Sequence, residues 1–242
     1  MSNPRIVVTG IGASSPIGGT APDSWSALLG GASGARTLEY DWVEQYNLPV
    51  TFAAQAAVRP DTVLERPVAK RLDPSSQFAL VAAMEAWVDA GSPDVEPERL
   101  GVDFATGIGG LWTLLDAWDT LREKGPRRVL PMTVPMLMPN AAAGNLSLHF
   151  GARAYARTVA SACASSTEAL VNAVEHLRDG LADVVIAGGT ETMSAIPYLL
   201  DKARFGYRMG SGEILDSMLY DGLIDPFMNY HMGITAENVA EK

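Results

Sequence analysis

The sequence predicts an α/β fold with a mostly parallel or mixed sheet. Short apolar, β-branched segments alternate along the chain with segments whose apolar residues recur at helical spacing, and several of the former end at glycine. This alternation is typical of α/β proteins. The chain has 242 residues, 48% hydrophobic and 19% charged, which is an ordinary globular balance and enough for one large domain or two small ones.

The N-terminal third contains one strand and two helices by this reasoning. Residues 5–9 form an apolar run that ends at Gly10, which predicts a buried strand. Residues 23–29 favour a short helix with Asp23 near its start, and residues 34–72 are mixed and are expected to contain loops. A clear helix then begins at Asp73-Pro-Ser-Ser, where Asp73 or Ser75 can act as the cap. Its apolar face is expected to comprise Phe78, Leu80, Val81, Met84 and Trp87.

The middle of the chain continues the alternation. A strand over 99–106 runs into Gly107-Ile-Gly-Gly110, and a helix is expected from about 112 to 124. Residues 126–140 are rich in proline and methionine and predict a packed irregular segment, whereas 141–150 predict a helix. A buried strand from Tyr155, a helix over 168–178 and a buried strand over 182–189 follow.

The charge and the few cysteines and histidines exclude several classes of protein. The formal charge of −10 argues against non-specific binding to nucleic acid or to an anionic membrane, because phosphates would be repelled. One cysteine excludes an internal disulfide framework, and three histidines with one cysteine lack the spacing of a zinc cluster. No signal-peptide pattern or long uncharged apolar run is present, so a cytoplasmic protein is expected. No metal or organic cofactor is implied.

The glycine motifs favour close backbone contacts rather than a nucleotide site. Gly10-Ile-Gly12 follows an apolar run, but a dinucleotide-binding fingerprint needs a third glycine where Ser15 stands. A tight strand-to-helix turn is the preferred interpretation. The pairs at 109–110 and 188–189 are interpreted as places where backbone passes close to another segment.

Cys163 is the most informative residue. It lies in Ser161-Ala-Cys-Ala-Ser165, between a predicted strand and a predicted helix. Helix N–H groups and the positive end of the helix dipole favour the thiolate, which is the better nucleophile. The small neighbours, Ala162, Ala164, Ser165 and Ser166, leave room for a substrate. A lone cysteine can equally be a small buried hydrophobic residue, but the strand–cysteine–helix context favours a nucleophile.

Several motifs in order resemble those of β-ketoacyl-acyl-carrier-protein synthases of the elongating, actinobacterial type. The resemblance covers about residues 5–191. The motifs are 7–19, 72–79, 105–111, 125–128 with 134–140, the cysteine motif 161–165 and the strand 184–191.

Beyond residue 191 the chain resembles a different family. Residues 204–210, 216–223 and 230–240 are similar to the loop domain of thiolases (acetyl-CoA acetyltransferases). We therefore expect a synthase N-terminal-like domain over 1–191 and a truncated thiolase-like loop segment over 192–242, whose last residues open a helix capped by Thr235. The implied fold is thiolase-like (layered αβαβα), represented by its N-terminal half with a partial loop domain, as in a fragment.

The resemblance implies an acyltransferase that forms an acyl-thioester on Cys163 for Claisen condensation in fatty-acid or polyketide synthesis. Both families take their acid–base groups from a second half, so self-acylation without turnover is expected of this chain. The alternatives are a thiolase acting on acyl-CoA, and a non-catalytic fragment that binds acyl chains or a partner subunit.

The resemblance also assigns substrate-binding positions. Ile108 and Met138 would line the acyl-chain tunnel, and His231 and Met232 would approach the sulfur. His149 is expected to be structural. His176 lies thirteen residues beyond Cys163 and cannot reach it at about 1.5 Å per helical residue, so it is expected to be solvated or a satisfied core group.

The implied partners are an acyl-carrier protein or acyl-CoA as substrate and further copies of the chain. Residues around Arg157 to Val159 would form a dimer interface, and residues 204–225 resemble a stretch used for tetramer contacts in thiolases. A homo-oligomer, a dimer and possibly a tetramer, is therefore expected.

Overall fold

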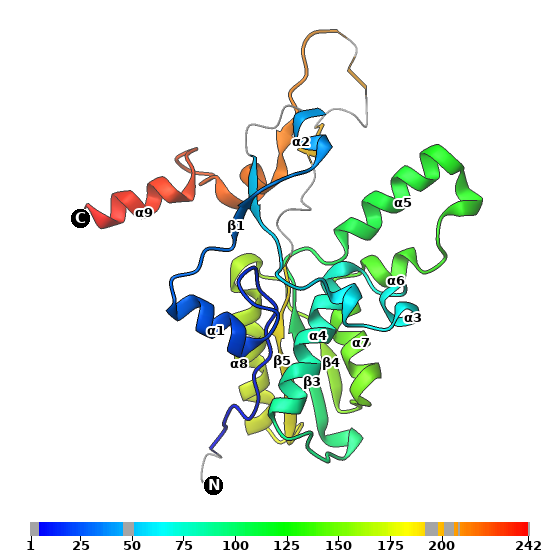
Figure 1. Ribbon diagram of the computed structural model, residues 1–242, viewed down its shortest axis with the longest axis vertical. Coiled ribbons are helices and arrows are strands. Elements are labelled where there is room, and N and C mark those ends of the chain that lie inside the picture. Colours follow the sequence, from blue (N-terminus) through cyan, green and yellow to red (C-terminus); the bar gives the residue numbers. More distant parts are fainter. Residues whose placement is uncertain (1–4, 46–50, 192–197, 201–205, 208, 242) are drawn as a thin grey trace. The chain divides into compact units, whose positions relative to one another are not determined.

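The computed structural model describes residues 5–45, 51–191, 198–200, 206–207 and 209–241 (Figure 1). The chain divides into two compact units, Met1–Glu191 and Thr192–Lys242. The boundary lies at the residue where the two predicted domains were separated. The synthase-like character of the first unit and the thiolase-like character of the second are not tested by this division and stay predictions.

A three-stranded sheet forms the centre of the first unit. Its strands are β3 (Leu100–Ala105), β4 (Tyr155–Arg157) and β5 (Val184–Gly189), in the order β4-β3-β5. Both pairings are parallel, with Gly101 opposite Tyr155 and Leu100 opposite Val184. The α/β class and the parallel sheet are therefore confirmed.

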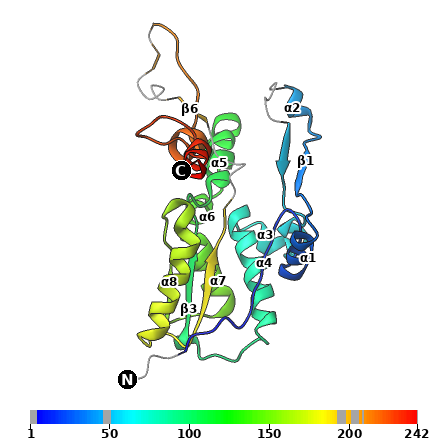
Figure 2. The same cartoon turned by 90° about the vertical axis from the view of Figure 1, so that its left-hand side faces the viewer.

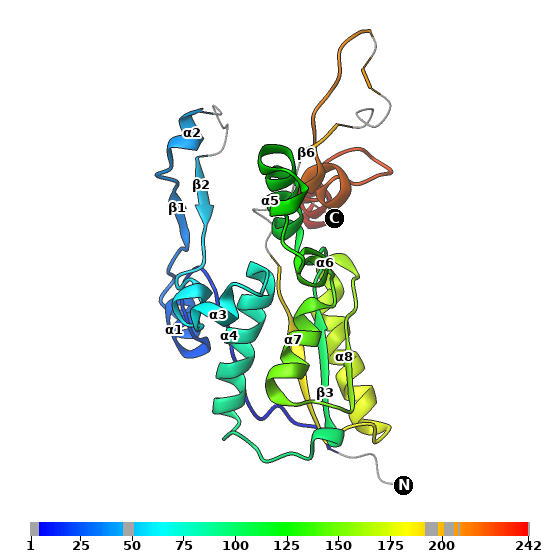
Figure 3. The same cartoon turned by 90° about the vertical axis from the view of Figure 1, so that its right-hand side faces the viewer.

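Helices cover both faces of this sheet. Helix α8 (Ser165–Arg178) packs on one face against β3 and β5, and α7 (Ala141–Phe150) packs on the other against β3 (Figures 2 and 3). Helix α4 (Pro74–Asp89) forms a further layer on α7. Every residue of β3 is buried, as expected of a strand covered on both faces. The largest fully buried apolar side chains are those of Leu100, Val102 and Leu146.

The start of α4 is fixed by Asp73, as predicted. The Asp73 side chain is 2% exposed, and its Oδ1 accepts hydrogen bonds from Ser75 N at 2.9 Å and Ser75 Oγ at 2.7 Å. Its other oxygen, Oδ2, accepts from Thr113 N at 3.1 Å and Thr113 Oγ1 at 2.6 Å. Thr113 lies in the first turn of α5 (Leu111–Lys124), so one buried carboxylate joins the starts of two helices.

The predicted strand over 5–9 does not form. Val7 and Val8 are 57% and 78% exposed, and a strand without a neighbouring ladder leaves its backbone groups to water. The segment that follows is bound to α4 instead, where Asp89 Oδ2 accepts from Ile11 N and Glu85 Oε2 accepts from Ala13 N, both at 2.9 Å.

The N-terminal glycines are explained by the same contact. A Cβ at Gly10 would lie 2.1 Å from the carbonyl oxygen of Ala86, and one at Gly12 would lie 1.9 Å from that of Ala82. These glycines let two backbones touch and do not form the expected strand-to-helix turn.

Shorter elements complete the region before α4. Helix α1 (Ala21–Leu29) begins two residues earlier than predicted and is capped by Thr20, whose Oγ1 accepts from Asp23 N at 3.2 Å. Asp23 lies in the first turn, near the helix start as expected. The mixed stretch holds more regular structure than expected. It contains the antiparallel pair β1 (Ala35–Thr37) and β2 (Phe52–Ala54), α2 (Asp41–Gln45), the 3-10 turn η1 (Pro60–Thr62) and α3 (Arg66–Ala69).

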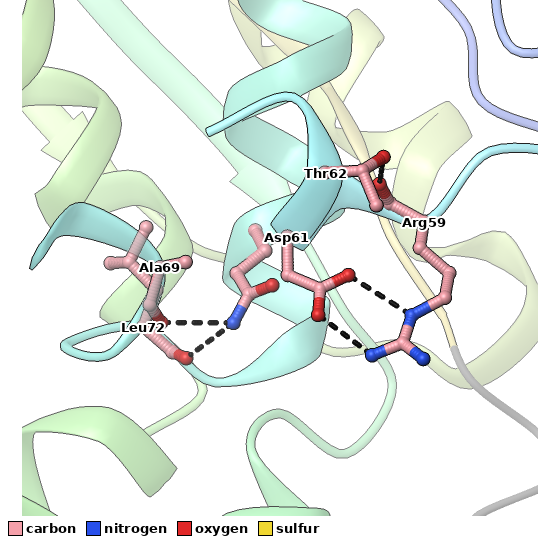
Figure 4. A network of polar contacts seen from close by, with 6 residues as sticks. Arg59, Asp61, Thr62, Ala69 and Leu72 are labelled. Atoms are coloured by element: carbon pink, nitrogen blue, oxygen red, sulfur yellow. Dashed lines mark hydrogen bonds and ion pairs between the residues drawn. The ribbon is translucent and has the colours of Figure 1, made fainter. Parts of the chain in front are cut away.

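Side-chain hydrogen bonds hold this stretch next to α4. Gln77 Nε2 donates to the carbonyl oxygens of Ala69 and Leu72 at 2.9 and 3.0 Å (Figure 4). Within the stretch, Arg59 pairs with Asp61 through two bonds of 3.0 and 2.7 Å. The hydrogen bonds from Gln77 therefore hold the turn that precedes α4 against the first turn of the helix.

Two further expectations on the first unit need correction. The segment 126–140 is not irregular throughout, because it contains the 3-10 turn η3 (Pro126–Arg128) and the helix α6 (Thr133–Leu137). The strand before the cysteine is short and mostly exposed rather than buried, since β4 is paired with β3 alone among the described strands. A second 3-10 turn, η2 (Pro97–Arg99), precedes β3.

The second unit contains the antiparallel pair β6 (Tyr198–Leu199) and β7 (Leu215–Asp216), the π-helical turn η6 (Met218–Leu223) and α9 (Met232–Ala240). Helix α9 begins four residues earlier than predicted. Its cap is His231, whose Nδ1 accepts from Gly233 N at 3.0 Å, and not Thr235.

Candidate active site

Cys163 lies on a sharp turn between the sheet and α8. It is exposed and occupies the middle of the 3-10 turn η4 (Ala162–Ala164), directly before the first residue of α8. Ala162 has φ +50°, a left-handed conformation that costs a residue with a Cβ about 1–2 kcal/mol. Such strain persists only where surrounding contacts hold the backbone in place. The turn is therefore a stabilised part of the fold, and it carries the thiol at the surface.

Hydrogen bonds from neighbouring serines hold the turn. Ser165 is 4% exposed; its Oγ accepts from Ser161 N at 2.8 Å and donates to the carbonyl oxygen of Ala162 at 2.7 Å. Ser161 Oγ donates to the carboxylate of Glu168. Ser165 was expected to leave room for a substrate, but its side chain is buried and fastens the turn instead.

The end of β5 allows the first turn of α8 to lie against the sheet. A Cβ at Gly189 would lie 2.2 Å from Ser166 Oγ and 3.0 Å from the carbonyl oxygen of Ala105. The interpretation of Gly188-Gly189 as a close backbone approach is therefore confirmed.

Ile108 lies on the turn that follows β3, and its side chain is 43% exposed. Gly109 N donates to Thr106 Oγ1 and Gly110 N donates to the carbonyl oxygen of Leu137, both at 3.1 Å. A Cβ at Gly109, whose φ is +89°, would lie 2.8 Å from Cα of Pro139. The structure thus places the Ile108 turn beside the segment that carries Met138.

Met138 caps the C-terminus of α6 and is 41% exposed. The Ile108 turn also approaches the cysteine turn, since a Cβ at Gly107 would lie 3.9 Å from Cα of Ala162. The backbone segments of three predicted site residues, Cys163, Ile108 and Met138, therefore form one continuous region of the first unit.

Glu191 is a residue that sequence reasoning left without a role. Its Oε2 accepts a hydrogen bond from Gly107 N at 2.5 Å, across 84 residues of sequence. The position of Glu191 directly after the glycine end of a strand is the signal that could have indicated it.

His231 and Met232 belong to the second unit, at the start of α9. His231 serves as the helix cap, and Met232 is 51% exposed. Their approach to Cys163 stays a prediction.

His176 is a satisfied core group, which confirms one of the two expected readings. Its side chain is buried, with Nδ1 2.9 Å from Asp103 Oδ2 and Nε2 2.5 Å from Arg157 Nη1. Because arginine can only donate, this pattern assigns a neutral ring that donates from Nδ1 and accepts at Nε2. Both nitrogens are engaged, so His176 cannot act as a base toward Cys163.

Tyr155 completes this buried cluster. Its hydroxyl donates to Asp103 Oδ2 at 2.8 Å, and the Arg157 guanidinium lies 5.3 Å from its ring centre. Burial raises the pKa of Tyr155 well above its ordinary value, and the hydrogen bond to the Asp103 carboxylate raises it further. The cluster ties the edge strand β4 to β3 and α8 and is structural.

Two negative findings apply to the described part of the chain. No group of three or more histidine, cysteine, aspartate or glutamate side chains is arranged there to hold a metal ion. None of its helices is long and apolar enough to cross a bilayer.

Comparisons with known proteins identify the family. Residues 3–205 match the family described as "Beta-ketoacyl synthase, N-terminal domain", so the match extends beyond residue 191 into the second unit. The 3-oxoacyl-[acyl-carrier-protein] synthase 2 of Mycobacterium tuberculosis is 37% identical over 80% of this chain and 47% of its own length. The enzyme of the same name from Staphylococcus aureus is 37% identical over 78% of this chain and 46% of its own.

Solved structures agree on the fold. A β-ketoacyl synthase from Burkholderia phymatum has a TM-score of 0.61 at 27% identity and covers 74% of this chain and 44% of its own. A type II polyketide ketosynthase solved with its acyl-carrier protein has a TM-score of 0.62 at 22% identity, over 78% of this chain and 51% of its own. The ishigamide ketosynthase/chain length factor has a TM-score of 0.69 at 21% identity, over 91% of this chain and 61% of its own.

The chain spans about half the length of the curated relatives that it matches. These matches, together with the cysteine turn on a parallel sheet covered by helices on both faces, give a single conclusion: the chain belongs to the β-ketoacyl synthase family and contains its N-terminal domain.

Proposed function

We propose that this chain is the cysteine-bearing part of an acyltransferase that forms an acyl-thioester on Cys163 for Claisen condensation in fatty-acid or polyketide synthesis. The observation that carries the proposal is the strained turn at Ala162, which holds the only cysteine exposed in front of α8. Curated relatives at 37% identity are named as 3-oxoacyl-[acyl-carrier-protein] synthases.

In the acylation step the Cys163 sulfur attacks the carbonyl carbon of a donor thioester. The new S–C bond forms as the donor S–C bond breaks, and the donor thiol leaves with the proton that Cys163 gives up. Splitting the overall reaction in this way is covalent catalysis. The serine bonds that fix the cysteine turn support the step, because they restrict the sulfur to one approach direction.

We propose that Ile108 and Met138 contact the acyl chain. Both side chains are apolar and partly exposed, and their backbone segments are adjacent through the bond from Gly110 N to the Leu137 carbonyl oxygen. Burial of an acyl chain against them would contribute about 0.8 kcal/mol for each methylene removed from water. His231 and Met232, in the second unit, remain predicted substrate-binding residues.

We propose an acyl-carrier protein as the donor, with acyl-CoA as the alternative. The curated relatives are named for the carrier protein, and one structural neighbour was solved with its own. Both donors carry an anionic phosphate on the pantetheine arm. Although the chain has a net charge of −10, Lys70 and Arg128 line one surface pocket of about 250 Å³ together with a single carboxylate, Asp116, so this pocket offers a small excess of positive charge to such a partner.

Condensation needs acid–base groups, and neither His176 nor His149 is placed to act as one. His176 has both ring nitrogens engaged in the core, and His149 lies on α7 with its ring against Phe150 at 4.7 Å between ring centres. We therefore expect acylation of Cys163 by these 242 residues, without release of condensation product.

We also propose a homodimer through β4. Among the described strands β4 pairs only with β3, so its other edge has hydrogen-bonding groups available for a second copy. Residues Arg157 to Val159 would lie at this interface. The predicted tetramer contacts over 204–225 fall partly outside the described residues, at 204–205 and 208.

The test is the intact mass after incubation with a long-chain acyl-CoA or acyl-carrier protein. One acyl adduct on the wild type, absent from Cys163→Ala, is the expected result. Ser166→Ala, next to the same turn, is the matched control and should still be acylated. A folded wild type that takes no adduct would overturn the proposal and favour a non-catalytic, acyl- or partner-binding fragment.

A further inference from the structure

The turn that carries Ile108 is held from two sides. On one side Gly110 N donates to the carbonyl oxygen of Leu137 at 3.1 Å, which fastens the turn to the segment before Met138. On the other side Gly107 N donates to Glu191 Oε2 at 2.5 Å. Glu191 therefore reaches this turn from the end of β5.

The glutamate is itself delivered by the sheet. Gly189 pairs with Ala105 at the end of the parallel ladder, and Thr190 N donates to the carbonyl oxygen of Ala105 at 3.0 Å. The chain therefore leaves β5 in register with the end of β3, which places the next side chain, that of Glu191, at the turn that follows β3. An ionised carboxylate that accepts from a backbone N–H makes a stronger bond than a neutral acceptor does.

The fit around Gly107 shows how closely the carboxylate approaches. A Cβ built at Gly107 would lie 2.7 Å from Glu191 Oε2, and the next nearest backbone is Cα of Ala162 at 3.9 Å. Gly107 thus lies close both to the carboxylate and to the strained residue that precedes Cys163. A shift of the carboxylate would change the spacing between the Ile108 turn and the cysteine turn.

We propose that Glu191 is a positioning residue that sets the Ile108 turn relative to Cys163 and so influences which acyl chains reach the sulfur. This inference deepens the proposed function and rests on it. Glu191 touches no reacting atom in this scheme. It acts through Gly107 N, and the geometry that it controls is the distance between the apolar side chain of Ile108 and the sulfur of Cys163.

Three variants separate this role from a merely structural one. Glu191→Ala removes the acceptor, whereas Glu191→Gln keeps an oxygen that can accept from Gly107 N. Gly107→Ala displaces the carboxylate from the other side and should reproduce the effect of Glu191→Ala. Glu123→Ala, an exposed carboxylate on α5, is the matched control.

Two readouts apply to the full chain. The first is hydrogen exchange at the Gly107 amide, which should accelerate about tenfold in Glu191→Ala as one hydrogen bond is lost. The second is alkylation of Cys163 by a short and a long N-alkyl iodoacetamide, which probes the acyl path without thioester chemistry. The ratio of the long-chain to the short-chain rate should change by about threefold or more in Glu191→Ala and stay near wild type in Glu191→Gln.

Each outcome decides the inference. Unchanged exchange at Gly107 in Glu191→Ala overturns it, and so does an equal change in both alkylation rates, since a structural defect would slow both reagents together. A wild type that cannot be acylated counts against the proposed function alone, because exchange and alkylation still report whether Glu191 positions the turn.

Discussion

Removal of the Asp73 carboxylate is the sharpest test of the helical framework behind the cysteine turn. The carboxylate is 2% exposed and accepts four hydrogen bonds, two from Ser75 at the start of α4 and two from Thr113 in the first turn of α5. Its Cγ would lie 3.1 Å from a Cβ at Gly110, so the carboxylate also lies close to the end of the Ile108 turn.

The magnitude follows from these contacts. Loss of an N-cap aspartate costs about 1 kcal/mol, and each buried donor left without an acceptor costs about 1–3 kcal/mol. Removal of the buried negative charge offsets part of the loss. We therefore expect Asp73→Ala to lower the free energy of unfolding by about 3–5 kcal/mol. Asp73→Asn keeps one acceptor oxygen for Ser75 and should lower the free energy of unfolding by about half as much.

The assay is urea denaturation followed by far-UV circular dichroism. Asp119→Ala, an exposed carboxylate on α5, is the control and should change the unfolding free energy by less than about 0.5 kcal/mol. A loss below about 1 kcal/mol in Asp73→Ala, with an unchanged dependence on urea, would refute the view that this carboxylate joins the two helices.

Three further predictions concern backbone contact and ionisation. Gly12→Ala should lower the free energy of unfolding by more than about 2 kcal/mol, because its Cβ would lie 1.9 Å from a carbonyl oxygen of α4. Gly144→Ala, which has open space around it in α7, should raise the free energy of unfolding by about 0.5–1 kcal/mol. Equal effects of the two substitutions in urea denaturation would contradict this. The hydrogen bond from Arg99 lowers the pKa of Asp183, so the stabilisation is present above the ordinary aspartate pKa of about 4 and is lost as pH falls below it; the difference in melting temperature between wild type and Asp183→Asn should shrink from pH 5 to about pH 2. Burial raises the pKa of Tyr155, so its contribution is complete below the ordinary tyrosine pKa of about 10 and declines above it; Tyr155→Phe should cost about 1–2 kcal/mol at neutral pH, and a cost that grows above about pH 10 would speak against this assignment.

Local patterns in the sequence were sufficient for the elements that carry the cysteine turn. Helix α7 has the predicted bounds, and the predicted helix at 168–178 forms as α8 with one additional turn at its start. Strands β3 and β5 could be predicted because both segments are mostly apolar, although β5 is half-buried and not buried as expected. Asp73 was recognisable as a cap from the residues around it, since capping is a local interaction.

Long-range contacts account for the failures. The apolar run at 5–9 has the composition of a strand, but strand formation depends on a neighbouring ladder, which composition does not reveal. Helical spacing excluded contact between His176 and Cys163 but left open whether His176 is solvated or a satisfied core group. Only the fold brings Asp103 and Arg157 to its two ring nitrogens.

The sequence by itself therefore determined the α/β class with a mostly parallel or mixed sheet, the close backbone approach at Gly188-Gly189 and the single cysteine in front of a helix. These follow from periodicity, capping and residue size, which act over a few neighbouring residues. Only the tertiary structure decided which distant groups meet: Asp73 with Thr113 and Glu191 with Gly107. Those contacts span 40 and 84 residues. The first exists because the fold brings the starts of α4 and α5 together, and the second because the parallel sheet brings the ends of β3 and β5 to one edge.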